Sequence, residues 1–305
     1  MRILVLGAGA TGGYFGARLI ESGAKVDFLV RPARAAQLAR SGLCLRTSSG
    51  DLQFGIKALE QLPDSYATDL VILSCKSYDL ESATRAIVPA MANGARLLPL
   101  LNGLRHLESL DREFGADNVL GGLCHISVNL ETDGSIRQIG GTSRLSFGAR
   151  PGQPEIPQRL VDGLLAMRVE TVHSADIVAA MWNKFTLLSA LAGITCLMRA
   201  SIGEIVAVAE GADLARWLYL ECAEVARRSG FAPGDDEVAQ ALRILTSEHS
   251  PLKASMLRDV ERGKRTEVEH VLGDMLARSH TLGVDAPLLS AACAHLRIHE
   301  AALLR

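Results

Sequence analysis

Three glycines near the start of the chain have a spacing that suits phosphate binding. The segment reads Gly7, Ala8, Gly9, Ala10, Thr11 and Gly12. A first glycine permits a tight turn, a second lets a pyrophosphate approach the backbone, and a third lets the following helix pack closely. The N-terminus of that helix would offer unpaired N–H groups and a partial positive charge to the phosphates. Because the apolar run Ile3 to Leu6 precedes the glycines and a helical pattern follows them, we predict a dinucleotide-binding turn; the alternative is a glycine-rich turn without a ligand.

The residue at the tip of the second predicted strand discriminates between the two nicotinamide dinucleotides. A site for NAD usually carries Asp or Glu about 20 residues after the glycines, where it binds the ribose hydroxyl. Here the strand 25–30 is followed by Arg31, and Asp27 lies inside the strand. A guanidinium group binds phosphate in a forked geometry. We therefore predict NADP as the cofactor, with Arg31 on its 2′-phosphate and Arg34 assisting; the alternative is an ordinary solvated arginine.

Three polar residues further along the chain could take part in a reduction. Lys76 and Asn102 follow apolar segments predicted as strands, and open parallel sheets bind ligands at the carboxyl ends of their strands. Lys184 lies in a predicted helix of the second half, among apolar neighbours. Reduction of a ketone requires a hydride donor and a proton donor, and an ammonium group can supply the proton while stabilising the forming alkoxide. The alternative for Lys184 is a lysine on the surface of an amphipathic helix.

The elements that must position these residues change in character along the chain. Short apolar runs without polar alternation are typical of strands buried on both faces, and such runs cover 3–6, 25–30, 70–74, 97–101, 119–123, 145–148 and 169–172. Helices are predicted at 10–22, 34–40 and 158–166, and a hairpin at 43–56. We predict a Rossmann-like, doubly wound parallel α/β domain over residues 1–173 and an all-helical domain over residues 174–305.

Composition excludes several classes of protein. The chain has 305 residues, of which 48% are apolar and 22% charged, an ordinary globular balance with room for two domains. Its formal net charge of −2 argues against nucleic acid as a partner, because phosphate backbones require a basic face. Six cysteines without a CxxC pair are typical of free thiols in a reducing compartment. Since no apolar run approaches about 20 residues and the chain starts on a predicted strand, we expect a cytoplasmic protein that spans no membrane.

Several short motifs, taken in order, are more specific than the glycine spacing. They are Cys75-Lys76-Ser77, Asn102-Gly103, Trp182-Asn183-Lys184, and Ser255-Met256 with Asp259 and then Thr266-Glu267. Together they resemble the ketopantoate reductase family, and the resemblance covers essentially the whole chain. That family reduces 2-dehydropantoate to D-pantoate with NADPH, on the route to pantothenate. The resemblance implies an NADP-dependent oxidoreductase acting on a C=O group, with its 2-oxo acid substrate lying between two domains.

The resemblance also implies which residues hold the cofactor. Gly7 to Gly12 would bind the pyrophosphate, and Lys76 and Asn102 would contact the cofactor as well. The backbone at Ile126 would approach the nicotinamide half, and Glu267 would contact the nicotinamide ribose.

The residues of the reaction follow from the same resemblance. Lys184 would be the general acid, which agrees with the chemistry of an ammonium group, and Glu267 would orient it. Asn102 would lie near the reacting carbonyl, and Ser255 would bind the substrate carboxylate or hydroxyl. For Glu267 the alternative is an exposed carboxylate in a charge-rich stretch.

The substrate pocket departs from the family pattern. The family carries asparagines four and eight residues after the catalytic lysine, on the same helix face, and another further on. Here these positions are Leu188, Ala192 and Ile202. Either ketopantoate is bound through other polar groups, such as Thr195, Ser189 or Ser255, or the substrate is a more apolar 2-oxo acid.

Three further hypotheses concern metals, catalysis and assembly. His295 and His299 are four residues apart on the last predicted helix, but no third ligand is evident, so we expect no metal. His125 is near the predicted cofactor site, in a role that is either structural or hydrogen-bonding. A non-catalytic NADP-binding sensor is the rival to an enzyme, although a sensor has no need of a proton donor. The apolar helices of the second half are compatible with a homodimer.

Overall fold

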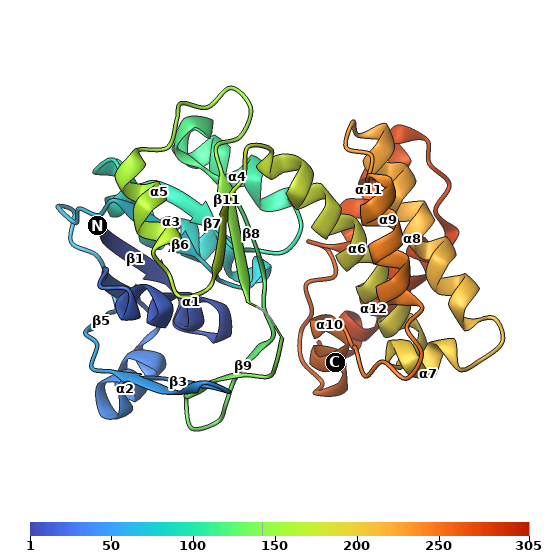
Figure 1. The fold of residues 1–305 in the computed structure, drawn as a ribbon, viewed down its shortest axis with the longest axis horizontal. Helices are drawn as coiled ribbons and strands as arrows, with labels where there is room; N and C mark the ends of the chain where they lie inside the picture. Colours follow the sequence, from blue (N-terminus) through green and yellow to red (C-terminus); the bar gives the residue numbers. More distant parts are fainter. Residues whose placement is uncertain (142, 305) are drawn as a thin grey trace. The chain divides into compact units, whose positions relative to one another are not determined.

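The computed structural model describes residues 1–141 and 143–304, which form two compact units (Figure 1). The first unit comprises residues 1–101 and 106–178, and the second comprises residues 102–105 and residues from 179 onward. The boundary predicted near residue 173 falls on the last residue of strand β12 (Glu170–His173), whereas the contacts divide the chain after Val178. The short segment 102–105 belongs with the second unit although the first unit flanks it in sequence.

A five-stranded parallel sheet is the centre of the first unit. Its order is β5-β2-β1-β6-β7, and every pair in it is parallel. The strands are β1 (Arg2–Leu6), β2 (Lys25–Leu29), β5 (Ala58–Leu59), β6 (Leu70–Leu73) and β7 (Arg96–Pro99). This order places β1 in the middle, so the turn after β1 lies at the point where the chain reverses its direction of winding. The predicted doubly wound α/β fold is confirmed.

Helices cover both faces of this sheet because successive side chains of a buried strand point to opposite faces. Ile3 and Val5 of β1 pack into one apolar cluster, with residues of α1 (Ala10–Glu21) and α5 (Gln158–Leu165). Leu4 and Leu6 pack into the other cluster, with residues of α3 (Leu80–Ala92) and α4 (Arg105–Phe114). A strand that is apolar on both faces therefore needs no polar alternation, which is why these runs could be recognised in the sequence.

Two smaller sheets complete the first unit. The predicted hairpin is present as β3 (Leu43–Thr47) and β4 (Gly50–Phe54), next to β10 (Ile136–Gln138) and β9 (Val128–Leu130). β11 (Arg144–Gly148) lies between β12 and β8 (Gly121–His125), parallel to the former and antiparallel to the latter. The remaining short elements are α2 (Pro32–Ser41), η1 (Ser77–Asp79) and η2 (Ala116–Asn118). The sequence analysis did not predict β5, β9 or β10, which are only two or three residues long.

The second unit is helical, as predicted. Its helices are α6 (Ile177–Met198), α7 (Ile202–Val206), α8 (Gly211–Arg228), α9 (Asp235–Leu245), α10 (Ser255–Glu261), α11 (Leu272–Leu282) and α12 (Pro287–Ala302). Side chains close several helix ends: Ser201 and Glu204 form a capping box at α7. The Glu221 carboxylate accepts the backbone N–H groups of Leu288 (3.0 Å) and Leu289 (2.8 Å) at the start of α12.

Helix α6 corrects the expectation that no apolar stretch reaches the length of a membrane span. Its 22 residues are long and apolar enough to cross a bilayer by length and composition, and its most apolar window is 56% buried. Core helices of soluble proteins pass the same test. Met181, Trp182 and Phe185 of this helix are buried, so its apolar character serves packing within the protein.

Candidate active site

The glycine turn follows β1 directly and leads into α1. Gly7 has a φ of +93°, a conformation that glycine adopts without strain, and its N–H donates to the Leu29 carbonyl at 2.9 Å. A Cβ on Gly12 would collide with the Gly7 carbonyl oxygen and with Ser74 Oγ. Ser74 is itself held in place, because its hydroxyl donates to the Leu6 carbonyl at 3.1 Å. The packing of helix against strand therefore leaves room only for glycine at position 12.

Gly9 is in the opposite situation. It has an ordinary extended backbone (φ −76°, ψ −162°), and a Cβ built on it would have no protein atom within 4 Å among the described residues. The fold itself therefore imposes no need for glycine at this position. A ligand that approaches the backbone closely would impose one, as a pyrophosphate does in dinucleotide sites.

The N-terminus of α1 can receive an anion. In the described part of the chain, no side chain caps this helix, and its first turn, which starts at Ala10, carries no acidic residue. The first N–H groups of a helix have no partner inside the helix, and the helix dipole adds a partial positive charge there. A phosphate beside Gly9 would satisfy both features.

Arg34 supports the turn from α2. Its Nε donates to the Ala8 carbonyl at 2.9 Å, and its Nη1 donates to the Gly134 carbonyl at 2.9 Å and to Gln37 Oε1 at 2.6 Å. Burial lowers the pKa of Arg34 from its usual value. The Arg34 guanidinium therefore binds backbone carbonyls, including that of Ala8, and stabilises the glycine turn.

Arg31 stands at the predicted position after β2. Its side chain is 73% exposed and forms an ion pair with Asp79, at 2.7 Å between Arg31 Nη2 and Asp79 Oδ1. Asp27, in contrast, accepts from Arg2 Nη2 at 2.9 Å and from the Tyr66 hydroxyl at 2.7 Å. Asp27 is therefore occupied within the sheet, whereas Arg31, at the tip of β2, is open to solvent. Its contact with a 2′-phosphate stays a prediction.

Lys76 and Ile126 lie just beyond strands of the first unit. Lys76 is three residues past the end of β6, is half-buried and precedes η1, with its carbonyl accepting the Asp79 N–H at 2.9 Å. Ile126 follows β8 and packs against the apolar cluster that contains β1 and α1. Their contacts with a cofactor stay predictions.

The second unit brings two predicted catalytic residues together. Lys184 lies in α6, and its ammonium group donates to Asn102 Oδ1 at 3.1 Å. The two residues are 82 positions apart in sequence, and Asn102 is three residues past the end of β7. This contact orients the ammonium group and leaves the carboxamide nitrogen of Asn102 as the donor end of the pair.

Glu267 lies in the connection between α10 and α11 and is only 6% exposed. Its carbonyl accepts the N–H groups of His270 and Val271, both at 3.1 Å. Burial lowers the pKa of the neighbouring His270, and the negative charge of Glu267 opposes part of this shift. The exposed carboxylate considered as an alternative is thus excluded. The contacts of Glu267 with Lys184 and with a ribose stay predictions.

Sequence reasoning missed His270 and Arg105. His270 is 7% exposed and lies against the turn at Asn102 and Gly103, and Arg105 Nη1 donates to the Glu269 carbonyl at 3.4 Å. A lone histidine beside a dense run of charges gives no signal in the sequence. Only the return of the chain from β7 to the second unit brings His270 next to Asn102 and Gly103.

The positions that depart from the family pattern differ in burial. Ala192 and Ile202 are fully buried, whereas Leu188 is half-buried, one helical turn after Lys184. Ser255 is the first residue of α10 and is half-buried. The hydroxyl of Thr195 donates to the Leu191 carbonyl of its own helix at 2.6 Å, and Ser189 is fully buried. Leu188 and Ser255 are therefore the most accessible of these candidates for substrate contact.

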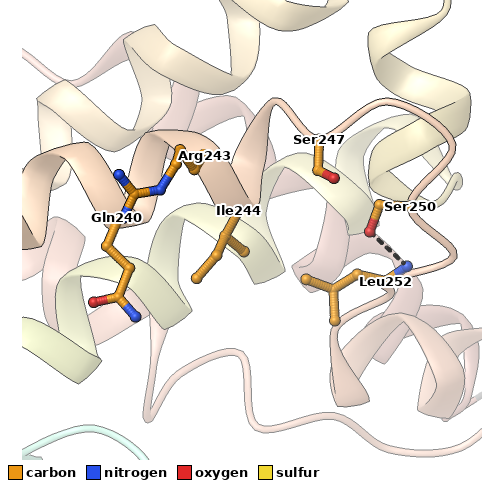
Figure 2. A pocket seen from close by; sticks show the side chains of 6 residues that line it. All are labelled: Gln240, Arg243, Ile244, Ser247, Ser250 and Leu252. Carbon is orange, nitrogen blue, oxygen red and sulfur yellow. Dashed lines mark hydrogen bonds between the residues drawn. The ribbon is translucent and has the colours of Figure 1, made fainter.

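A pocket of about 380 Å³ lies elsewhere on the second unit (Figure 2). It is lined by residues of α9 and the following loop, Gln240, Arg243, Ile244, Ser247, Ser250 and Leu252. It contains none of the predicted site residues. Among residues 1–141 and 143–304 there is also no group of three His, Cys, Asp or Glu side chains that could hold a metal ion.

A parallel sheet in this order, with a glycine turn after its central strand, defines a dinucleotide-binding unit of the Rossmann type. The comparisons that follow show an oxidoreductase that acts on a CH–OH/C=O group and uses a nicotinamide dinucleotide. The family model "Ketopantoate reductase PanE/ApbA" matches residues 3–152, and the corresponding C-terminal model matches residues 176–300. The chain belongs to the ketopantoate reductase family.

Individual relatives agree with this assignment. The chain is 35% identical to the "Uncharacterized oxidoreductase YkpB" of Bacillus subtilis over 99% of both chains. It is similar to a PanE/ApbA family ketopantoate reductase from Ralstonia eutropha, with a TM-score of 0.89, 27% identity and 100% of both chains covered. It also shares its fold with D-mandelate dehydrogenase in a ternary structure with NADH and anilino(oxo)acetate, with a TM-score of 0.88, 21% identity and 100% and 99% coverage.

Proposed function

We propose that this protein is a cytoplasmic NADPH-dependent reductase of a 2-oxo acid, with 2-dehydropantoate as the first candidate substrate and D-pantoate as its product in pantothenate biosynthesis. The observation that carries the proposal is the 3.1 Å hydrogen bond from the Lys184 ammonium to Asn102 Oδ1. This hydrogen bond holds the Lys184 ammonium, a proton donor, beside the Asn102 carboxamide. Both residues belong to the helical unit of a chain whose family uses a nicotinamide dinucleotide. The six free thiols are compatible with a reducing compartment.

The residues proposed to hold the cofactor are those of the glycine turn and the strand ends. They are Gly7, Ala8, Gly9, Ala10, Thr11, Gly12, Arg31, Lys76, Asn102, Ile126 and Glu267. The open space beside Gly9 and the uncapped start of α1 fit the pyrophosphate of such a group. When bound, the reduced nicotinamide supplies a hydride to the carbonyl carbon.

The chain's own residues supply the rest of the reaction. The Lys184 ammonium gives one proton to the carbonyl oxygen, so that a ketone plus a hydride and a proton becomes a secondary alcohol. The Asn102 carboxamide orients Lys184 through Oδ1 and can donate to the same carbonyl oxygen through its nitrogen. Ser255 is proposed to bind the substrate carboxylate or hydroxyl. Residues 1–173 would then serve the cofactor, and residues 174–305 the substrate and, in a homodimer, the partner copy.

Turnover distinguishes an enzyme from a sensor. The purified protein is mixed with NADPH and a panel of 2-oxo acids that includes 2-dehydropantoate, and the loss of NADPH absorbance is followed. Oxidation with at least one acid supports the reductase. Tight NADPH binding without oxidation by any acid would favour a non-catalytic NADP-binding protein.

Replacement of Arg31 tests the choice of cofactor. Arg31→Ala should weaken NADPH binding by about 1.5 to 3 kcal/mol, the scale of a hydrogen bond to a charged group, and leave NADH binding almost unchanged. The dissociation constants of both cofactors are measured by fluorescence titration. Arg85→Ala is the matched control, because Arg85 is another exposed arginine of the same unit that pairs with a carboxylate. An unchanged NADPH/NADH preference in Arg31→Ala would show that the assignment to NADP is wrong.

Leu188 favours a second candidate substrate, a more apolar 2-oxo acid. It is half-buried one turn after Lys184, where the family pattern has an asparagine. Ala192 and Ile202 need no such explanation, because both are fully buried and their apolar side chains stabilise the helical core. The choice between the two substrates therefore depends mainly on position 188.

Leu188→Asn should move specificity toward hydroxylated acids. A new hydrogen bond contributes about 1 kcal/mol, so kcat/KM for 2-dehydropantoate should rise about fivefold relative to an unsubstituted branched 2-oxo acid. The ratio of the two kcat/KM values is the measurement. Leu187→Asn, at the neighbouring half-buried leucine of α6, is the control. A ratio that is unchanged in Leu188→Asn would remove Leu188 from the substrate site.

A further inference from the structure

The segment 102–105 is anchored to the helical unit around His270. Gly103 has a φ of +75°, and a Cβ on it would lie 2.8 Å from the His270 carbonyl oxygen and 3.5 Å from the ring carbon Cδ2. Arg105 Nη1 donates to the Glu269 carbonyl at 3.4 Å. The backbone of this turn therefore lies directly against residues 269–270, with no space for a side chain at position 103.

Asn102 is held at both of its ends. Its backbone carbonyl accepts a hydrogen bond from the imidazole of His270. Its side-chain Oδ1 accepts the bond from the Lys184 ammonium at 3.1 Å. One residue thus connects the buried imidazole with the ammonium group.

We propose that His270 is a positioning residue that holds Asn102 in the place from which it orients the Lys184 ammonium. This inference rests on the proposed function. Without the imidazole donor, the Asn102 carbonyl loses a partner and the turn loses its tether to the helical unit. Lys184 keeps its charge but not its fixed direction, and misplacement of a reacting group lowers the rate of the chemical step.

The surroundings of His270 determine its protonation state. Burial, the largest effect, lowers the pKa of His270 and Arg105 acts in the same direction, whereas Glu267, Asp274 and the hydrogen bond to the Asn102 carbonyl favour the protonated ring. A histidine with a lowered pKa contributes stability that is present above its unfolded value, about 6.5, and is lost as the pH falls through the folded value. The pKa shift favours the neutral ring; because a protonated ring still donates to the Asn102 carbonyl, acidification should cost stability through the buried charge and leave this hydrogen bond in place.

Three variants separate the hydrogen bond from the packing. His270→Phe keeps an aromatic ring without a donor, whereas His270→Gln and His270→Asn place an amide donor near the positions of the two ring nitrogens. We expect His270→Phe to lower kcat about 10- to 100-fold, with NADPH binding changed less than about twofold. One of the two amide variants, the one whose donor reaches the Asn102 carbonyl, should restore most of kcat. His280→Phe, at an exposed histidine of α11, is the matched control.

Hydrogen exchange in the cofactor-free protein gives a readout that does not depend on activity. The amides of residues 102–105 should exchange about fivefold faster in His270→Phe, the loss expected for one hydrogen bond, and return to the wild-type rate in the amide variant that restores kcat. Wild-type kcat and wild-type exchange in His270→Phe would overturn the inference. If His270→Phe fails to fold, the amide variants decide, because equal kcat and equal exchange of residues 102–105 in His270→Gln and His270→Asn would contradict it. A fully active Lys184→Ala variant would instead overturn the proposed function.

Discussion

Replacing Lys184 by alanine should lower kcat about 10²- to 10⁴-fold, the range that a positioned general acid contributes. In the proposed mechanism the side chain donates the proton to the forming alkoxide, and Asn102 Oδ1, 3.1 Å away, orients it. NADPH binding should change little, because the proposed phosphate site is the glycine turn. The measurements are kcat with the best 2-oxo acid of the panel and the dissociation constant of NADPH for the same variant.

Two further variants show whether the proton or only the charge of Lys184 matters. Lys184→Arg keeps a positive charge, but a guanidinium group does not release its proton in proteins, so this variant should be nearly as slow as Lys184→Ala. Lys57→Ala, at an exposed lysine in a loop of the first unit, should have wild-type activity. Full activity in Lys184→Ala would refute the mechanism. Full activity in Lys184→Arg alone would show that charge stabilisation, without proton transfer, is the role of this residue.

The second large effect concerns Gly9 and Gly12, which should respond differently to the same added methyl group. Gly9→Ala should weaken NADPH binding at least about tenfold, equivalent to about 1.4 kcal/mol, because its Cβ would occupy the approach of the pyrophosphate. Its free energy of unfolding should fall by less than about 1 kcal/mol, the typical cost of alanine at a helix N-cap. The reason is that a Cβ at Gly9 meets no described protein atom within 4 Å.

Gly12→Ala should lower both quantities. Its Cβ would collide with the Gly7 carbonyl oxygen and Ser74 Oγ, so α1 must move away from β1. Overpacking of this kind costs about 1 to 3 kcal/mol of unfolding free energy, and the displaced turn should also bind NADPH poorly. Urea denaturation and fluorescence titration measure the two effects. Equal losses of stability in Gly9→Ala and Gly12→Ala would contradict the view that a ligand, and not the fold, requires Gly9.

The glycine turn could be predicted because its causes are local. Gly7, Gly9 and Gly12 lie within six residues, and a buried strand and a helix adjoin them in sequence. The same holds for the central strands, whose apolar runs reflect burial on both faces, and for the helical second half. Short pairings such as β9 with β10, three residues each, have too few side chains for a pattern and depend on the strands beside them.

The sequence by itself determined the class of fold, the dinucleotide turn and the residue types available for a reduction, because each of these is written in neighbouring residues. Only the tertiary structure decided that Asn102 belongs with Lys184 across 82 positions, that His270 holds the same turn, and that Ala192 and Ile202 are core residues while Leu188 is accessible. The physical reason is that contacts between distant segments, and the burial they produce, depend on how the helices pack. A single side chain such as His270 carries no trace of that packing in its sequence neighbourhood.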